Sequence, residues 1–196
     1  MQRLAAVVVA VSFVFVACGS DQEPALEPAV TTSTAPGSTA PGQTTTTAPP
    51  AGFGTAAISV PPDGPAYLKA VRAAHQPGAD RVVFEFEGDV PGYAVRYVER
   101  PITEDGSGNT VEVEGDSVLE VRMEQASGAD LSGEDLRQTY TGPTRIDPGT
   151  PVVTELVRTG DFEAVLTWVI GVRGRPGFNV TTVTGNRLVI EVAGGS

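Results

Sequence analysis

Two residues are unique in this chain and limit the chemistry that it can perform. Cys18 is the only cysteine and His75 the only histidine among the 196 residues. A serine, histidine and aspartate triad would have to use His75, and no Gly-x-Ser-x-Gly elbow is present to hold its serine. A zinc site normally takes several histidine or cysteine ligands. We therefore expect a non-catalytic protein with no metal and no other cofactor.

The thiol of Cys18 stands at the end of a segment built like an export signal. Arg3 and the amino terminus give a basic start, Leu4–Val16 is apolar, and the small residue Ala17 precedes the cysteine. The apolar stretch is shorter than the roughly 20 residues that span a bilayer. We expect residues 1–17 to be a cleaved signal peptide.

The sequence Phe15-Val16-Ala17-Cys18 resembles the lipobox of bacterial lipoproteins, with Phe15 where such boxes usually carry leucine. The resemblance implies that the Cys18 thiol receives acyl chains such as palmitate and that Cys18 becomes the mature N-terminus. Two or three chains, at about 0.8 kcal/mol per buried CH₂, hold a protein on a membrane. The expected location is the extracytoplasmic face of the cell membrane. A plain signal peptide with an incidental cysteine is the alternative.

Residues 18–56 are predicted to form a disordered tether. The segment is rich in Thr, Ser, Pro, Ala and Gly, with the blocks Thr44–Thr47 and Pro49-Pro50. So few large apolar side chains cannot offset the entropy that folding costs. At about 3 Å per residue in a polyproline-like form, the tether reaches on the order of 100 Å.

Residues 57–196 are long enough for one domain with its own core. The whole chain carries 24 acidic and 13 basic side chains, a net charge of -11 at pH 7. This charge argues against nucleic acid or anionic lipid as the partner.

Strand periodicity dominates the predicted domain. In residues 81–87, Val82, Phe84 and Phe86 alternate with charged residues and predict one inward face. Similar segments are 93–98, 111–114, 118–123, 151–157, 164–172, 179–183 and 188–192, with turns expected at 105–109, 115–116, 159–161 and 184–186. Short strands at this spacing predict an all-β sandwich or partly closed barrel. Residues 164–170 are apolar on both faces, which predicts a central strand buried on both sides.

Four segments in order resemble a known family: His75, Asp80–Phe86, Pro91-Gly92-Tyr93 and Asn186–Val192. They look like the AMIN-like domain of actinobacterial lipoproteins, a relative of the AMIN modules beside cell-wall amidases and secretins. The resemblance covers Tyr67–Ala193. It implies a β-sandwich of two facing antiparallel sheets that directs proteins to the envelope by contacting peptidoglycan. No amidase domain accompanies it in this chain.

Two segments are ambiguous. Residues 65–75 fit either a helix beginning at Pro65 or an alternating strand, and the family resemblance favours the strand. In residues 131–140, Ser132 before Glu134 and Asp135 predicts a turn or two of helix.

Acidic residues at two places have the spacing of chemical sites. Glu85 and Glu87 at i and i+2 lie about 7 Å apart on a strand, which a glycosidase could use, but a solvated strand face explains them better. The segment Asp105–Asn109, with Glu104, offers oxygen ligands for Ca²⁺ yet lacks the full calcium-loop pattern. We expect a hairpin turn there.

Binding is the better kind of function, because glycan sites use exposed aromatic rings beside charged groups. Trp168 and most other rings are expected in the core. The segment 173–178 is a cationic turn in an acidic domain, and arginine binds carboxylates such as those of peptidoglycan stem peptides. Pairing with the domain's own carboxylates is the alternative. The candidate binding residues are Tyr93, Arg96, Tyr97, Arg173, Arg175 and Phe178.

The sequence therefore predicts a lipid-anchored envelope protein that binds peptidoglycan or a wall-associated partner. Two alternatives remain open. One is a carrier or sensor for a small apolar ligand in a sandwich cavity. The other is an adaptor that recruits an envelope enzyme through a sheet edge.

Overall fold

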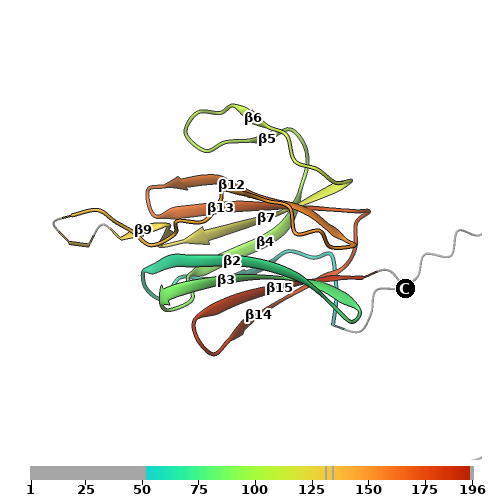
Figure 1. The fold of residues 1–196 in the computed structure, drawn as a ribbon, viewed down its shortest axis with the longest axis horizontal. Coiled ribbons are helices and arrows are strands. Elements are labelled where there is room, and N and C mark those ends of the chain that lie inside the picture. Colours follow the sequence, from blue (N-terminus) through green and yellow to red (C-terminus); the bar gives the residue numbers. More distant parts are fainter. Residues whose placement is uncertain (1–51, 131, 134, 195–196) are drawn as a thin grey trace, which may run out of the picture. The chain divides into compact units, whose positions relative to one another are not determined.

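The computed structural model describes residues 52–194, except residues 131 and 134 (Figure 1). The predicted signal peptide, Cys18 and the tether up to residue 51 lie outside the described residues. Every regular element in the described part is a β-strand. The strands form two main sheets that face each other, so the prediction of an all-β sandwich is confirmed.

The larger sheet has six strands, all antiparallel to their neighbours. Across the sheet they are β1 (Ile58–Val60), β4 (Gly92–Val98), β7 (Ser117–Glu124), β13 (Val165–Val172), β12 (Val153–Phe162) and β11 (Arg145–Ile146). The strand predicted to be doubly buried, β13, lies between β7 and β12, and seven of its eight residues are buried.

The second sheet has five strands. Across it they are β14 (Phe178–Val183), β15 (Arg187–Ala193), β3 (Ala79–Gly88), β2 (Ala66–Gln76) and β8 (Ala126–Ser127). Its pairs are antiparallel except β2 with β8, which is parallel. The chain crosses between the sheets at Gln125, which follows the last residue of β7 and precedes β8.

Two short ribbons complete the described fold. One pairs β5 (Ile102–Thr103) with β6 (Thr110–Val111), and the other pairs β9 (Ala129–Asp130) with β10 (Arg137–Gln138). The β5–β6 ribbon lies outside the larger sheet (Figure 1), where its apolar residues pack on Val169 of β13. This ribbon explains why β13 is apolar on both faces.

Inward side chains of the two sheets form the main core. Phe84 of β3 meets Trp168 of β13 edge to face, with ring centroids 6.0 Å apart, and Tyr140 meets the same indole. The predicted inward face of β3 is confirmed, because Val82, Phe84 and Phe86 are all buried. Trp168 is fully buried, also as predicted.

The structure settles one ambiguous segment and corrects the other. Residues Ala66–Gln76 form strand β2, so the helical alternative is wrong. The helix expected in residues 131–140 is absent from the described part of that segment. Instead Asp130 accepts hydrogen bonds from the backbone and hydroxyl of Ser132 and from Arg137, which closes a β-ribbon.

One predicted turn is wrong, and the turn predicted at residues 115–116 is present but does not close a hairpin. Residues 159–161 lie within β12, and the chain turns at Glu163-Ala164 instead. Residues 115–116 do not join a hairpin, because β6 pairs with β5 while β7 belongs to the larger sheet. The hairpin turns predicted at 105–109 and 184–186 are confirmed by the β5–β6 and β14–β15 pairings.

The two ends of the sandwich differ. At one end, the Gly54 end, residue 54 pairs with Phe178, and the turns near residues 77, 115, 150 and 175 gather. At the opposite end, the far end, lie segment 61–65 and the turns at residues 88–91, 125, 163–164 and 184–186. The far end is on the left in Figure 1.

Candidate functional site

Three of the predicted binding residues come together at the Gly54 end. The guanidinium carbon of Arg175 lies 4.3 Å from the centroid of the Tyr97 ring. Tyr97 also meets Phe178 edge to face, with ring centroids 5.8 Å apart. We call this stack of Arg175, Tyr97 and Phe178 the arginine stack.

The Tyr97 hydroxyl fixes the loop that carries Arg175. It donates a 2.5 Å hydrogen bond to the carbonyl of Pro176, the next residue in the loop. Burial raises the pKa of Tyr97 to about 12, against the opposing effect of the Arg175 charge. The phenol therefore keeps its proton at neutral pH and holds the loop in place.

Arg175 is only weakly paired with a carboxylate. Its carboxylate contact among the described residues is with Glu99, 3.9 Å away and on a side chain that is 92% exposed. In contrast, Arg72 and Arg81 each lie 2.6 Å from a glutamate oxygen. A contact at the limit of ion-pair distance to so exposed a partner contributes little. The Arg175 guanidinium is thus oriented by an aromatic ring, on a side chain that is 53% exposed.

The remaining candidates lie elsewhere or serve the fold. The Arg173 guanidinium donates to the Pro151 carbonyl at 2.6 Å and so ties two loops together. Arg96 points to the outer face of the larger sheet, where it pairs with Glu120 at 2.9 Å.

Two of the predicted rings are buried and expose little of their ring faces. Phe178 is 1% exposed because it occupies the first inward position of β14, and not the turn before that strand. Tyr93 is also buried, beside the far end. We predicted that both rings would contact a ligand, but in the structure both pack in the core.

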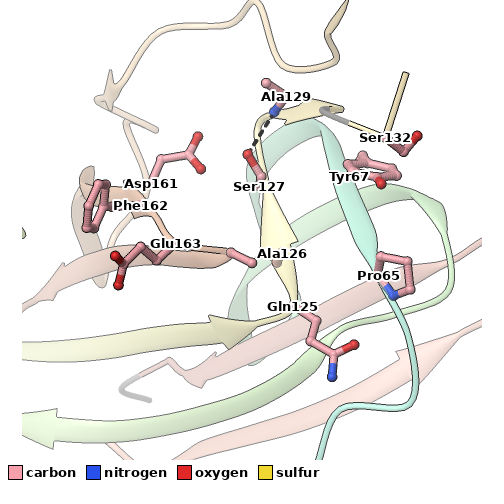
Figure 2. Close-up of a pocket in the computed structure, with 11 residues that line it drawn as sticks. Pro65, Tyr67, Gln125, Ala126, Ser127, Ala129, Ser132, Asp161, Phe162 and Glu163 are labelled. Carbon is pink, nitrogen blue, oxygen red and sulfur yellow. Dashed lines mark hydrogen bonds between the residues drawn. The ribbon is translucent and has the colours of Figure 1, made fainter. Parts of the chain in front are cut away.

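A hollow of about 670 Å³ at the far end has no counterpart in the predictions from sequence. Figure 2 shows Phe162 and Glu163 on one side of β8 and Pro65 and Tyr67 on the other. The Phe162 side chain is 63% exposed. A phenylalanine directly before a hairpin turn can indicate an exposed apolar site. This signal was missed because the sequence predicts the turn at residues 159–161 and not at 163–164.

A family model now gives this geometry a context. The model for the AMIN-like domain matches residues 66–194, which are most of the chain. The chain belongs to the AMIN-like family. Comparison with curated proteins and with solved structures finds no match. Membership indicates a peptidoglycan-related, non-catalytic module at an extracytoplasmic, cell-envelope location.

His75 and Asp80, two residues that carry the resemblance to the AMIN-like domain, are in contact in the structure. They are opposite each other in the β2–β3 hairpin, and the Nδ1 atom of His75 lies 2.8 Å from the Asp80 carboxylate. The other Asp80 oxygen accepts backbone N–H groups of Val152 and Val153, at 2.7 and 2.8 Å. Asp80 therefore joins the two sheets at the Gly54 end.

The Pro91-Gly92-Tyr93 segment also has a structural role. Segment 61–65 crosses Gly92 so closely that a Cβ atom there would overlap the backbone of Pro62. A glycine is needed at this position for the close approach. The motif thus holds segment 61–65 across the far end.

The carboxylates considered for catalysis are engaged in ion pairs on the AMIN-like domain surface. Arg72 lies 2.6 Å from Glu85 and lowers the pKa of that carboxyl, while Arg137 lies 2.9 Å from Glu87. Asp105 accepts a hydrogen bond from the Thr167 hydroxyl. The described residues contain no cluster of three His, Cys, Asp or Glu side chains placed to hold a metal ion. They also include no helix with the length and apolar character needed to cross a bilayer.

Proposed function

We propose that this protein is an envelope lipoprotein anchored by acylated Cys18. Its AMIN-like domain binds the carboxylate groups of peptidoglycan. The anchor rests on the lipobox-like sequence at residues 15–18. The binding function rests on family membership and on one feature of the site. That feature is Arg175, an oriented guanidinium without a close carboxylate partner among the described residues.

The chemistry of the arginine stack suits a carboxylate ligand. Guanidinium groups bind carboxylates through two parallel hydrogen bonds, and stacking on a ring restricts the guanidinium before the ligand arrives. Stem peptides and lactyl groups of peptidoglycan carry such carboxylates. An acidic domain that repels carboxylates elsewhere would direct them to this position.

The geometry gives less support to a carrier of small apolar ligands. Buried side chains such as Phe84 and Trp168 fill the space between the sheets. The 670 Å³ hollow is on the surface, since Phe162 in its lining is largely exposed.

Sedimentation with isolated peptidoglycan tests the wall-binding part of the proposal. The full-length lipidated protein, dissolved in mild detergent, would be mixed with peptidoglycan at about 50 and about 200 mM salt. Arg175→Ala should reduce retention and flatten its salt dependence. Arg81→Ala removes the same charge from an exposed arginine that is already paired, and it should bind like the wild type. Equal retention of the two variants would exclude the arginine stack.

Detergent-phase partitioning tests the anchor. Cys18→Ser removes the sulfur that receives the lipid, so the variant should remain an unprocessed precursor. Normal cleavage and lipidation of Cys18→Ser would show that the lipoprotein assignment is wrong.

A further inference from the structure

Exposed apolar side chains are concentrated at the far end. Val60, Phe162 and Val183 are large hydrophobic residues that remain exposed, and each ends a strand at this end. The remaining exposed large hydrophobic residue of the described part, Leu136, lies in the β9–β10 ribbon, which also extends from this end (Figure 1). Monomeric domains rarely gather such residues in one region unless they bind something.

Two hollows open at the far end and share one segment. The first, of about 670 Å³, contains Phe162 and Pro65. The second, of about 430 Å³, contains Val60 and Val183. Segment 61–65 passes from the second hollow to the first, since Pro61 lines one and Pro65 the other. We call the two hollows, with segment 61–65 between them, the far-end surface.

Charge on the far-end surface has a single sign. Asp161 and Glu163 line the first hollow and Asp63 and Asp89 the second, and neither hollow is lined by Arg or Lys. Arg158 lies 3.4 Å from Asp161. The other three carboxylates have no ion-pair partner among the residues that the structure describes.

The backbone at this surface is held in uncommon conformations. The four described non-glycine residues with positive φ are Gln125, Glu163, Ala164 and Asn186. All four line one of the two hollows. Asparagine tolerates this region, but the other three cost about 1 kcal/mol or more each relative to glycine. Turns at the Gly54 end use glycine at such positions, for example Gly78 and Gly174.

Both described ends of the domain lie at the Gly54 end, opposite the far-end surface. Residues 1–51 connect to the domain at Gly52, next to the residue 54 pairing with Phe178 at the opposite end. The last described residue, Gly194, bonds Gly78 at that same opposite end.

We propose that the far-end surface docks a protein segment that carries basic and large apolar side chains. The apolar residues would fill the two hollows, and the basic residues would pair with Asp63, Asp89 and Glu163. A carboxylate-rich glycan strand or an anionic lipid surface would be repelled by these groups. The inference is independent of peptidoglycan binding, because Arg175 lies at the other end.

Selection from a library of random 12-residue peptides displayed on phage tests the proposal. The bait is the full-length protein in nanodiscs of neutral lipid, after removal of phage that bind empty nanodiscs. Enriched peptides should combine Lys or Arg with Leu, Phe or Trp. Their binding to Phe162→Ser should be at least about tenfold weaker, since large apolar anchors dominate such interfaces. Phe162 is mostly exposed, so this change should leave the melting midpoint nearly unaltered.

Matched carboxylate variants test the charge part. Glu163→Gln should weaken binding of the enriched peptides and reduce its salt dependence. Glu99→Gln removes an exposed carboxylate at the Gly54 end and should have no effect on peptide binding. The proposal is overturned by no enrichment, by enrichment of acidic peptides, or by peptides that bind Phe162→Ser as well as wild type.

A crosslinker at position 162 distinguishes a different protein from a second copy of this chain as the partner that docks on the far-end surface. A photoreactive phenylalanine analogue replacing Phe162 would be activated in intact envelopes. Adducts with a basic segment of a different protein support the proposal. Adducts exclusively between two copies of this chain would overturn it in favour of self-association.

Discussion

Removal of the Asp80 carboxylate should cost more stability than removal of any exposed aspartate. Asp80 is 1% exposed and accepts two backbone N–H groups from the loop that leads into β12. Asp80→Ala leaves both groups buried without acceptors, at about 1–3 kcal/mol each. We expect a loss of about 3–5 kcal/mol, a large share of the 5–15 kcal/mol typical of a domain.

Asp147→Ala is the matched control. Asp147 also accepts a backbone N–H, from Gly149 at 2.9 Å, but in an exposed turn where water can replace it. Its loss should stay within about 1 kcal/mol. Denaturant unfolding of full-length variants measures both free energies. Similar losses for Asp80→Ala and Asp147→Ala would refute the inference that Asp80 joins the sheets.

The pH dependence of the same site has a definite sign. Burial alone would raise the pKa of Asp80, but hydrogen bonds from His75 and the two backbone amides outweigh it and hold the pKa below 3.8. A carboxyl with a lowered folded pKa stabilises the protein above its unfolded pKa, and this contribution is lost as pH falls through the folded pKa. Asp80→Asn cannot ionise. The stability gap between wild type and Asp80→Asn should therefore shrink below about pH 4, and a constant gap would contradict the assignment.

Three further changes test the fold, each by denaturant unfolding. Glu163→Asn with Ala164→Gly should stabilise the protein by about 1 kcal/mol, because both turn residues have positive φ, and destabilisation would mean that the turn is misassigned. Phe84→Ala should cost about 3–5 kcal/mol and Glu85→Ala much less, and equal losses would mean that the faces of β3 are assigned the wrong way round. Gly171→Ala should cost more than about 2 kcal/mol, because its Cβ would overlap the Glu114 carbonyl, and a neutral result would exclude that close approach.

Local patterns predicted the strands well where one face is buried. Alternation in β3 and the doubly apolar run in β13 both follow from which side chains leave water. The turn at Glu163-Ala164 could not be predicted, since neither residue is a favoured turn former. Gly160 predicts a turn, but it lies within β12. There the Asp105 side chain approaches it so closely that a larger residue would overlap it.

The sites depend on contacts between distant parts of the sequence. Composition identified Tyr97 and Arg175 as candidates, but nothing local shows that one stacks on the other. The far-end surface needs turns from both sheets to converge, with segment 61–65 between them. Periodicity within one strand carries no information about such convergence.

The outer edge of β14 bears on whether copies of this protein aggregate. Gly54 already occupies the backbone groups of Phe178, and the Asn179 side chain accepts the N–H of Val180. Free strand edges are templates on which another chain can add a strand and begin a fibril. At Val180 the backbone N–H is already bonded to the Asn179 side chain and cannot donate to an added strand. The edge of β14 is therefore partly blocked although the strand carries no charged residue, and Asn179→Val, which frees the Val180 N–H, should make the domain more prone to fibrils.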